Sequence, residues 1–174
     1  AVTPMTHVGG RLVILSMFSG AETIVHSGFN EEKIFDAIEN GKVTDIFLPP
    51  TGIYKLLEHP KLLTTNLSSL KKILYGSAPM NVDRLKEALK VFGPVMQGGY
   101  GQTECPTFIT ALMAEDHYVD GEIAPDSRLK SVGRHTVLSE LSIFDENKKP
   151  VPVGEIGEVV VKGANASLGY YNAP

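Results

Sequence analysis

The chain has 174 residues, of which 43% are hydrophobic and 21% charged, with a formal net charge of −4, as is typical of a globular domain with a hydrophobic core. Its 16 lysines and arginines are scattered along the sequence, which argues against a nucleic-acid-binding or anionic membrane surface. The single cysteine, Cys105, excludes an internal disulfide and a cysteine zinc cluster. There is neither a membrane-spanning apolar run nor a recognisable leader, so we expect a cytoplasmic protein without a transmembrane segment.

The N-terminal elements alternate between helix and strand. The apolar stretch 8–18 predicts a buried helix that ends at Gly20, and the short β-branched stretch 22–26 predicts a strand. Asn30 is a typical N-cap for the next helix, which Gly41 ends.

The same alternation continues to about residue 100. Further strands are predicted over three segments: 44–48, 72–75 and 95–99. A short helix is predicted near 53–57, and a clearly amphipathic helix begins after Asn81 and ends at Gly93. This order predicts an α/β fold with a mostly parallel sheet flanked by helices.

The character of the sequence changes after about residue 114. A polar, turn-rich stretch is followed by a predicted strand over 137–144, and residues 157–162 are its predicted antiparallel partner. We therefore predict an α/β subdomain over residues 1–112 and a β-rich, barrel-like segment, the truncated start of a barrel subdomain, over residues 113–174.

Two glycine-containing turns follow neighbouring predicted strands. Gly76-Ser77-Ala78-Pro79 follows the strand 72–75, and residues 98–104 (G-G-Y-G-Q-T-E) follow the strand 95–99. One helix joins the two strands, so a right-handed crossover makes them parallel and adjacent. Both turns then lie at the carboxyl edge of the sheet, where open α/β folds bind ligands.

The residue types in these turns suit a nucleoside triphosphate. The Tyr100 ring offers a face for a purine, and the small backbone of 76–78 can approach the other side of the base. The Thr103 hydroxyl can donate to a phosphate, and Glu104 can hold Mg²⁺ through hard oxygen atoms.

Gly98 and Gly99 lack side chains and are expected to leave room beside the nucleotide for a second substrate. The alternative is that both segments are ordinary turns and Glu104 is a solvated surface acid. Spacing alone leaves the two interpretations about equal, because short motifs often match by chance.

Four motifs, in order along the chain, resemble those of the adenylate-forming (AMP-binding) superfamily. Residues 100–104 (Y-G-Q-T-E) resemble its Y-G-x-T-E core, and 76–79 (G-S-A-P) its G-G-A-P turn. Residues 154–174 are similar to its G-E-x-G-E … G-Y-x-x-x-P signature, and 4–7 (P-M-T-H) match P-x-x-H. The chain looks like an internal part of the N-terminal domain of an acyl-CoA synthetase (fatty-acid–CoA ligase), and it most resembles the bacterial fatty-acyl or aryl-acid CoA ligases.

This resemblance implies roles for individual residues. The residues implied to bind ATP or AMP are Gly76, Ser77, Ala78, Pro79, Gly99, Tyr100, Gly101, Gln102 and Thr103. His7, Gly98 and Gly99 are implied to line the acyl pocket. The implied catalytic residues are His7, Thr103 and Glu104, with Glu104 as the Mg²⁺ ligand. For His7, the alternative is a packed or capping residue.

The implied activity is that of an ATP-dependent acid–thiol ligase. A carboxylic acid, fatty or otherwise hydrophobic, reacts with ATP and Mg²⁺ to give an acyl-adenylate, and coenzyme A then takes the acyl group. The phosphate loop, the ribose-binding Asp and the catalytic Lys of such enzymes are expected outside these 174 residues, so we expect the isolated chain to be inactive.

Two alternatives remain at this point. One is an amino-acid-activating or luciferase-like adenylating enzyme, and the other is a non-catalytic nucleotide-binding module. The small-molecule partners would be the acid, ATP and coenzyme A, with no nucleic acid; a homo-oligomer is compatible with the sequence.

Overall fold

A five-stranded mixed sheet organises the computed structural model, which describes residues 1–106 and 108–172. The strands lie in the order β1-β2-β3-β4-β7. They are β1 (Asp45–Leu48), β2 (Lys72–Gly76), β3 (Met96–Tyr100), β4 (Thr110–Leu112) and β7 (Arg134–His135). β1, β2 and β3 are parallel, whereas β4 and β7 are antiparallel additions.

The predicted mostly parallel sheet is therefore correct only for β1 to β3, and the sheet as a whole is mixed. β4 follows β3 after a short connection, residues 101–109. A parallel crossover needs a dozen or more residues, so the chain can return only as an antiparallel strand.

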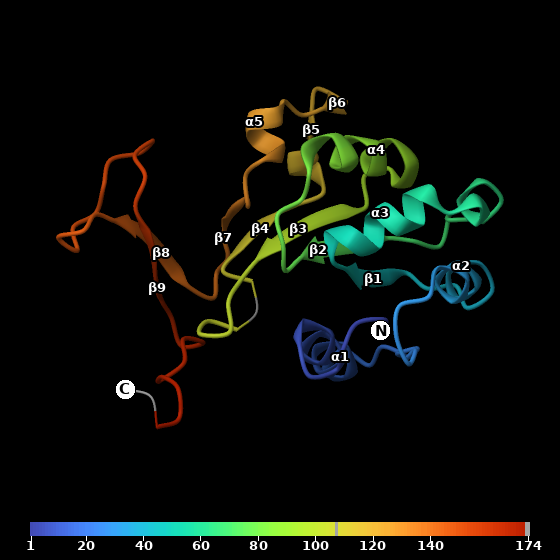
Figure 1. The fold of residues 1–174 in the computed structure, drawn as a ribbon, viewed down its shortest axis with the longest axis horizontal. Coiled ribbons are helices and arrows are strands. Elements are labelled where there is room, and N and C mark those ends of the chain that lie inside the picture. Colours follow the sequence, from blue (N-terminus) through green and yellow to red (C-terminus); the bar gives the residue numbers. More distant parts are fainter. Residues whose placement is uncertain (107, 173–174) are drawn as a thin grey trace.

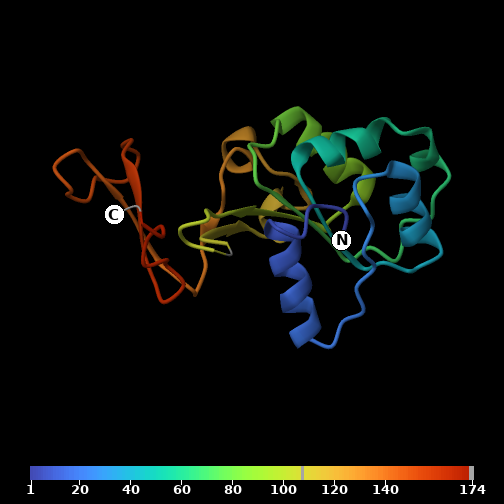
Figure 2. The same cartoon turned by 60° about the horizontal axis from the view of Figure 1, so that its bottom comes forward.

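Helices lie on both sides of the sheet, but only one of its faces is covered closely (Figures 1 and 2). α3 (Pro50–Glu58) and α4 (Val82–Phe92) lie on one face, with the short α5 (Asp126–Leu129) beside α4. α1 (Val8–Phe18) lies on the other side, and Figure 2 shows it projecting away from the sheet. α2 (Glu31–Glu39) lies near the β1 edge.

The predicted helix starts are confirmed by their capping contacts. The Asn30 side chain accepts a hydrogen bond from the Lys33 amide (2.9 Å), and the Asn81 side chain accepts one from the Arg84 amide (3.1 Å). Each bond satisfies an amide that the first turn of a helix leaves without a partner. Gly93 ends α4 with a φ of 74°, a conformation that glycine adopts without strain.

One core joins these elements. Its largest fully buried side chains come from the inward faces of α2, α3 and α4 and from β1 to β3: Ile34, Phe35, Ile38, Leu48, Ile53, Leu56, Ile73, Leu85 and Met96. Burial of such side chains is the main favourable term for folding.

The predicted strand over 22–26 is wrong, because this segment is irregular. In this segment the main-chain amide of His26 donates a hydrogen bond to the Ala1 carbonyl oxygen, and Val25 is 57% exposed. β-branched side chains favour a strand only when a neighbouring strand pairs with it and packs against it, and in the described residues no strand does so here.

The last part of the chain forms a hairpin that extends away from the sheet (Figure 1). β8 (Glu140–Phe144) pairs antiparallel with β9 (Glu158–Lys162), which confirms the predicted pairing. β8 starts three residues later than predicted, and Val137 is fully exposed. The described residues of this part contain no closed barrel.

The remaining elements are small connections. Two short 3-10 turns are η1 (Pro60–Leu63) and η2 (Glu115–His117), and β5 (Tyr118–Val119) pairs with β6 (Glu122–Ile123). Over residues 1–106 and 108–172, no helix combines the length and hydrophobicity needed to cross a bilayer.

Candidate active site

The two glycine-containing turns lie side by side at the carboxyl ends of β2 and β3. These strands are parallel neighbours, and Gly76 is opposite Gly99 in the register. The backbones are so close that a β-carbon on Gly76 would lie 2.4 Å from the Gly99 carbonyl oxygen. The predicted arrangement of the turns is thus confirmed, and it requires glycine at residue 76.

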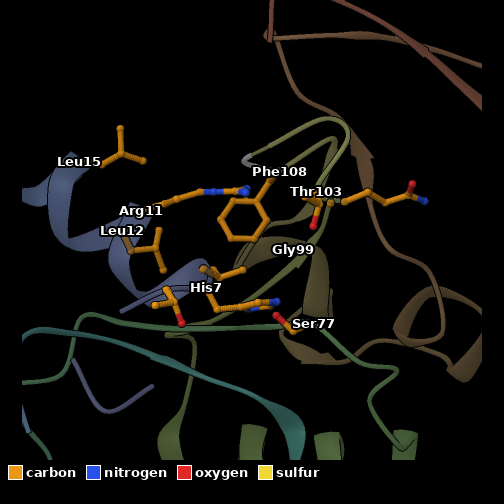
Figure 3. Close-up of a pocket in the computed structure, with 12 residues that line it drawn as sticks. His7, Arg11, Leu12, Leu15, Ser77, Gly99, Thr103 and Phe108 are labelled. Atoms are coloured by element: carbon orange, nitrogen blue, oxygen red, sulfur yellow. The ribbon is translucent and has the colours of Figure 1, made fainter. Parts of the chain in front are cut away.

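A cavity of about 330 Å³ separates these turns from the start of α1 (Figure 3). Six of the predicted site residues line it: His7, Ser77, Gly99, Gly101, Gln102 and Thr103. His7 is the N-cap residue of α1, and in Figure 3 it points into the same space as Ser77. The cavity wall does not include the other predicted residues: Gly76, Ala78, Pro79, Gly98, Tyr100 and Glu104.

Aromatic rings occupy the space that the two glycines of β3 were expected to leave open. A β-carbon on Gly98 would lie 2.9 Å from the Tyr75 ring, and one on Gly99 would lie 2.3 Å from the Phe108 ring. The two glycines thus make room for the rings of Tyr75 and Phe108, and Gly99 also lines the cavity, so their place beside a second substrate stays a prediction. Nothing in the motif spacing pointed to Phe108, which closes one side of the cavity.

The hydroxyl of Tyr75 belongs to a buried pair behind β3. It lies 2.9 Å from Nε2 of His117, and Nδ1 of the same ring lies 2.7 Å from the Met113 carbonyl oxygen. A carbonyl only accepts hydrogen bonds, so Nδ1 carries the proton and Nε2 accepts from Tyr75. Burial lowers the pKa of His117 and raises the pKa of Tyr75, so both groups stay neutral.

Glu104 is held by the far end of the described chain. The Tyr170 hydroxyl donates to its Oε1 atom (2.6 Å), and the Ser167 amide donates to its carbonyl oxygen (2.7 Å). The hydrogen bond from Tyr170 lowers the pKa of Glu104, which keeps the carboxylate charged. In the sequence, Tyr170 belongs only to a family signature, and no motif or spacing points to its contact with Glu104.

The residues after β3 fit a magnesium ion that arrives with a nucleotide. In the described part of the chain, no three histidines, cysteines or acidic residues gather as a ready-made metal site. Mg²⁺ in nucleotide sites needs only one or two carboxylates, because phosphates and water complete its shell. Glu104 can supply that carboxylate, while Tyr100, whose hydroxyl accepts a hydrogen bond from Gln102 Nε2 (2.6 Å), presents an anchored ring.

Comparison with known proteins identifies the family. Residues 1–171 match the family model described as AMP-binding enzyme. The chain belongs to the AMP-binding enzyme family. The resemblance inferred from the four motifs is confirmed.

Individual members of this family are similar over almost all of the chain. It is 38% identical to the medium/long-chain-fatty-acid–CoA ligase FadD8 of Mycobacterium tuberculosis, over 99% of this chain and 29% of that protein. It is 30% identical to a feruloyl-CoA synthase from Amycolatopsis sp, over 98% of this chain and 33% of that protein.

A solved structure agrees with these relationships. The amide bond synthetase McbA from Marinactinospora thermotolerans superimposes with a TM-score of 0.88 at 34% identity, covering 96% of this chain and 32% of that chain. The chain thus spans about a third of the length of the proteins it matches.

Proposed function

We propose that the protein carrying this chain is an ATP-dependent acyl-CoA synthetase, an acid–thiol ligase. The observation that carries the proposal is the adjacent placement of the two turns beside one cavity, with His7 facing them from α1. In this proposal the two turns form the nucleotide side of the site, and His7 marks its carboxylate side.

The residues divide the work of the first half-reaction. Tyr100 and the backbone of 76–78 bind adenine, the Thr103 hydroxyl donates to a phosphate, and His7 faces the carboxylate. Glu104 would hold Mg²⁺, which supplies charge neutralisation at the phosphates when bound. Donors oriented at the phosphate stabilise the charge that develops during transfer.

The chemistry proceeds in two balanced steps. A carboxylate oxygen forms a bond to the α-phosphorus of ATP, and the bond to pyrophosphate breaks. The coenzyme A thiolate then forms a bond to the acyl carbon, and the bond to AMP breaks.

A hydrophobic acid suits the cavity best. Its walls include four apolar side chains: Val8, Leu12, Leu15 and Phe108. A fatty or aryl acid buries its body against such a surface. The names of the two similar ligases described above, for a fatty acid and for ferulate, agree with this class.

A second candidate concerns the acceptor. McbA is an amide bond synthetase, so an amine instead of a thiol is a specific alternative for the second step. Amino-acid activation is less favoured, because among the described residues no carboxylate lines the cavity to hold an ammonium group. A luciferase-like adenylating enzyme shares the first step.

The remaining proposals concern the longer protein. We propose that residues 1–112 form part of an α/β subdomain and that β8–β9 begins a barrel subdomain within 113–174. The protein would work in the cytoplasm. Whether it assembles into a homo-oligomer can be tested by measuring its molecular mass in solution. The isolated chain would lack turnover, because the expected partners of the ribose and the triphosphate lie outside residues 1–174.

The test is ATP–pyrophosphate exchange by the full-length protein with a panel of carboxylic acids. We expect exchange with hydrophobic acids and its loss by at least about a hundredfold in Thr103→Ala, because a charge-stabilising donor is removed. Leu63→Ala is the matched surface control, since Leu63 is 89% exposed.

Adding coenzyme A or an amine then identifies the acceptor. The proposal is wrong if no acid on the panel supports exchange while the protein is folded, and a non-catalytic nucleotide-binding module then becomes the better interpretation.

A further inference from the structure

Residues 165–170, the tail segment, contact the loop that follows β3. Asn165 Nδ2 donates to the Pro106 carbonyl oxygen (3.2 Å), and the Ser167 amide donates to the Glu104 carbonyl oxygen (2.7 Å). Tyr170 then places its hydroxyl 2.6 Å from Oε1 of Glu104. Three contacts therefore connect the two segments around one acidic residue.

The first two contacts involve main-chain carbonyl oxygens of the loop and hold the tail segment against it. The Tyr170 hydroxyl differs, because it reaches the side chain of Glu104 and one of its two carboxylate oxygens. An ionised carboxylate has about four acceptor positions, so the donor from Tyr170 leaves positions on the Glu104 carboxylate able to bind a cation.

We propose that Tyr170 is a positioning residue that fixes the orientation of the Glu104 carboxylate, which would hold the divalent metal of a bound nucleotide. This inference rests on the proposed function, since it assumes that Glu104 meets a metal–nucleotide complex. It adds that the carboxylate is oriented by a residue 66 positions along the chain.

Exposure explains why such a device is useful. The Tyr170 side chain is 60% exposed, and Glu104 is exposed as well, so metal and nucleotide can reach the carboxylate. An exposed glutamate rotates freely among its rotamers, and ordering it costs conformational entropy when the metal binds. The tail segment already holds Tyr170 in place. Its hydroxyl therefore orders the Glu104 side chain before the metal binds, which reduces the entropic cost of binding.

The sequence contains a matched control. Tyr171 directly follows Tyr170 but is 94% exposed, and within the described residues its side chain makes no hydrogen bond. Tyr170→Phe and Tyr171→Phe thus remove the same hydroxyl from neighbouring positions, and only the first removes a donor to Glu104.

The experiment measures ATP binding to the full-length protein by calorimetry, once with Mg²⁺ and once with a chelator. We expect Mg²⁺ to tighten ATP binding in the unchanged protein, and Tyr170→Phe to reduce this metal-dependent gain by about three- to tenfold. Binding in the chelator, and both values for Tyr171→Phe, should stay unchanged.

A double-mutant cycle with Glu104→Gln tests the route of the effect. If Tyr170 acts through Glu104, Tyr170→Phe should change nothing further in the Glu104→Gln background. An equal loss with and without metal would show a merely structural role and overturn the inference. Tighter metal-dependent binding in Tyr170→Phe would also overturn it, because the hydroxyl would then compete with the metal.

The two proposals fail in distinguishable ways. If Mg²⁺ does not change ATP affinity in the unchanged protein, the assignment of the metal–nucleotide site itself fails. If Mg²⁺ does so but Tyr170→Phe behaves like Tyr171→Phe, only the role of Tyr170 fails.

Discussion

The sheet with its helices and the β8–β9 hairpin arm (residues 137–163) are stabilised in different ways. Every member of the core cluster lies between Val2 and Leu129, so the arm contributes none. Three apolar side chains of the arm are fully exposed: Val137, Val153 and Ile156. The sheet region thus has its own hydrophobic core, whereas the arm is held by the hydrogen-bond ladder between β8 and β9. The two site turns belong to the first region, which suits residues that must keep a fixed geometry.

The largest expected effect is the loss of a core side chain in the sheet region. Phe35→Ala should lower the free energy of unfolding by about 3–5 kcal/mol, because Phe35 is completely buried and the change leaves a cavity. Urea denaturation of the chain measures this. Phe18→Ala is the control with the same chemical change, and since Phe18 is 86% exposed it should cost far less. Equal losses in both variants would contradict the difference in packing.

A smaller effect is expected at the buried pair behind β3. Tyr75→Phe leaves Nε2 of His117 without its donor and should cost about 1–3 kcal/mol of unfolding free energy. The same denaturation experiment measures it. Tyr118→Phe is the control, because the Tyr118 hydroxyl makes only a long contact of 3.5 Å with the Leu89 carbonyl oxygen. A larger loss for Tyr118→Phe would show that the pair adds little.

The same pair predicts a pH dependence. Burial lowers the pKa of His117 in the folded protein below that of the unfolded chain. The unfolded chain therefore binds the proton more readily, and stability should fall as the pH is lowered from about 6.5, the ordinary histidine pKa. Denaturation midpoints between pH 8 and pH 5 measure this fall. In His117→Asn the slope in this range should be reduced, and an unchanged slope would assign the effect to other groups.

The smallest effect is expected in the arm. Ile156→Ala should change the free energy of unfolding by less than about 0.5 kcal/mol, because the side chain is fully exposed. Ile73→Ala, the same change at a residue only 1% exposed, should cost about 2–5 kcal/mol. A loss above about 1 kcal/mol for Ile156→Ala would mean that the arm has a core of its own.

Local features of the sequence predicted most of the sheet region. The structure confirms three such short-range signals. They are the helix caps at Asn30 and Asn81 and the single helix that joins the two strands carrying the turns. A cap acts within three residues, and a one-helix crossover permits one handedness, so few alternatives exist.

Long-range contacts could not be predicted in this way. Among the described residues, the strand expected over 22–26 has no pairing partner. β4 pairs with β3 because a short connection returns the chain, and β7 joins β4 across residues 113–133. Tyr75 meets His117 across 42 positions, and Glu104 meets Tyr170 across 66. Propensity and spacing carry no information about such partners, so the turns of the candidate site could be located while the side chains that support them could not.

Because Glu104 precedes Tyr170 in the sequence, the ribosome synthesises the residues of the two turns before it synthesises Tyr170. Both turns and the helix between them are synthesised as one continuous piece, so β2, α4 and β3 can assemble as soon as they emerge. The Tyr170 hydroxyl follows Glu104 by 66 residues. At about 5–20 residues per second, that delay is roughly 3–13 seconds. During this interval the nascent chain already holds its two strand-end turns, while Glu104 is still free to rotate.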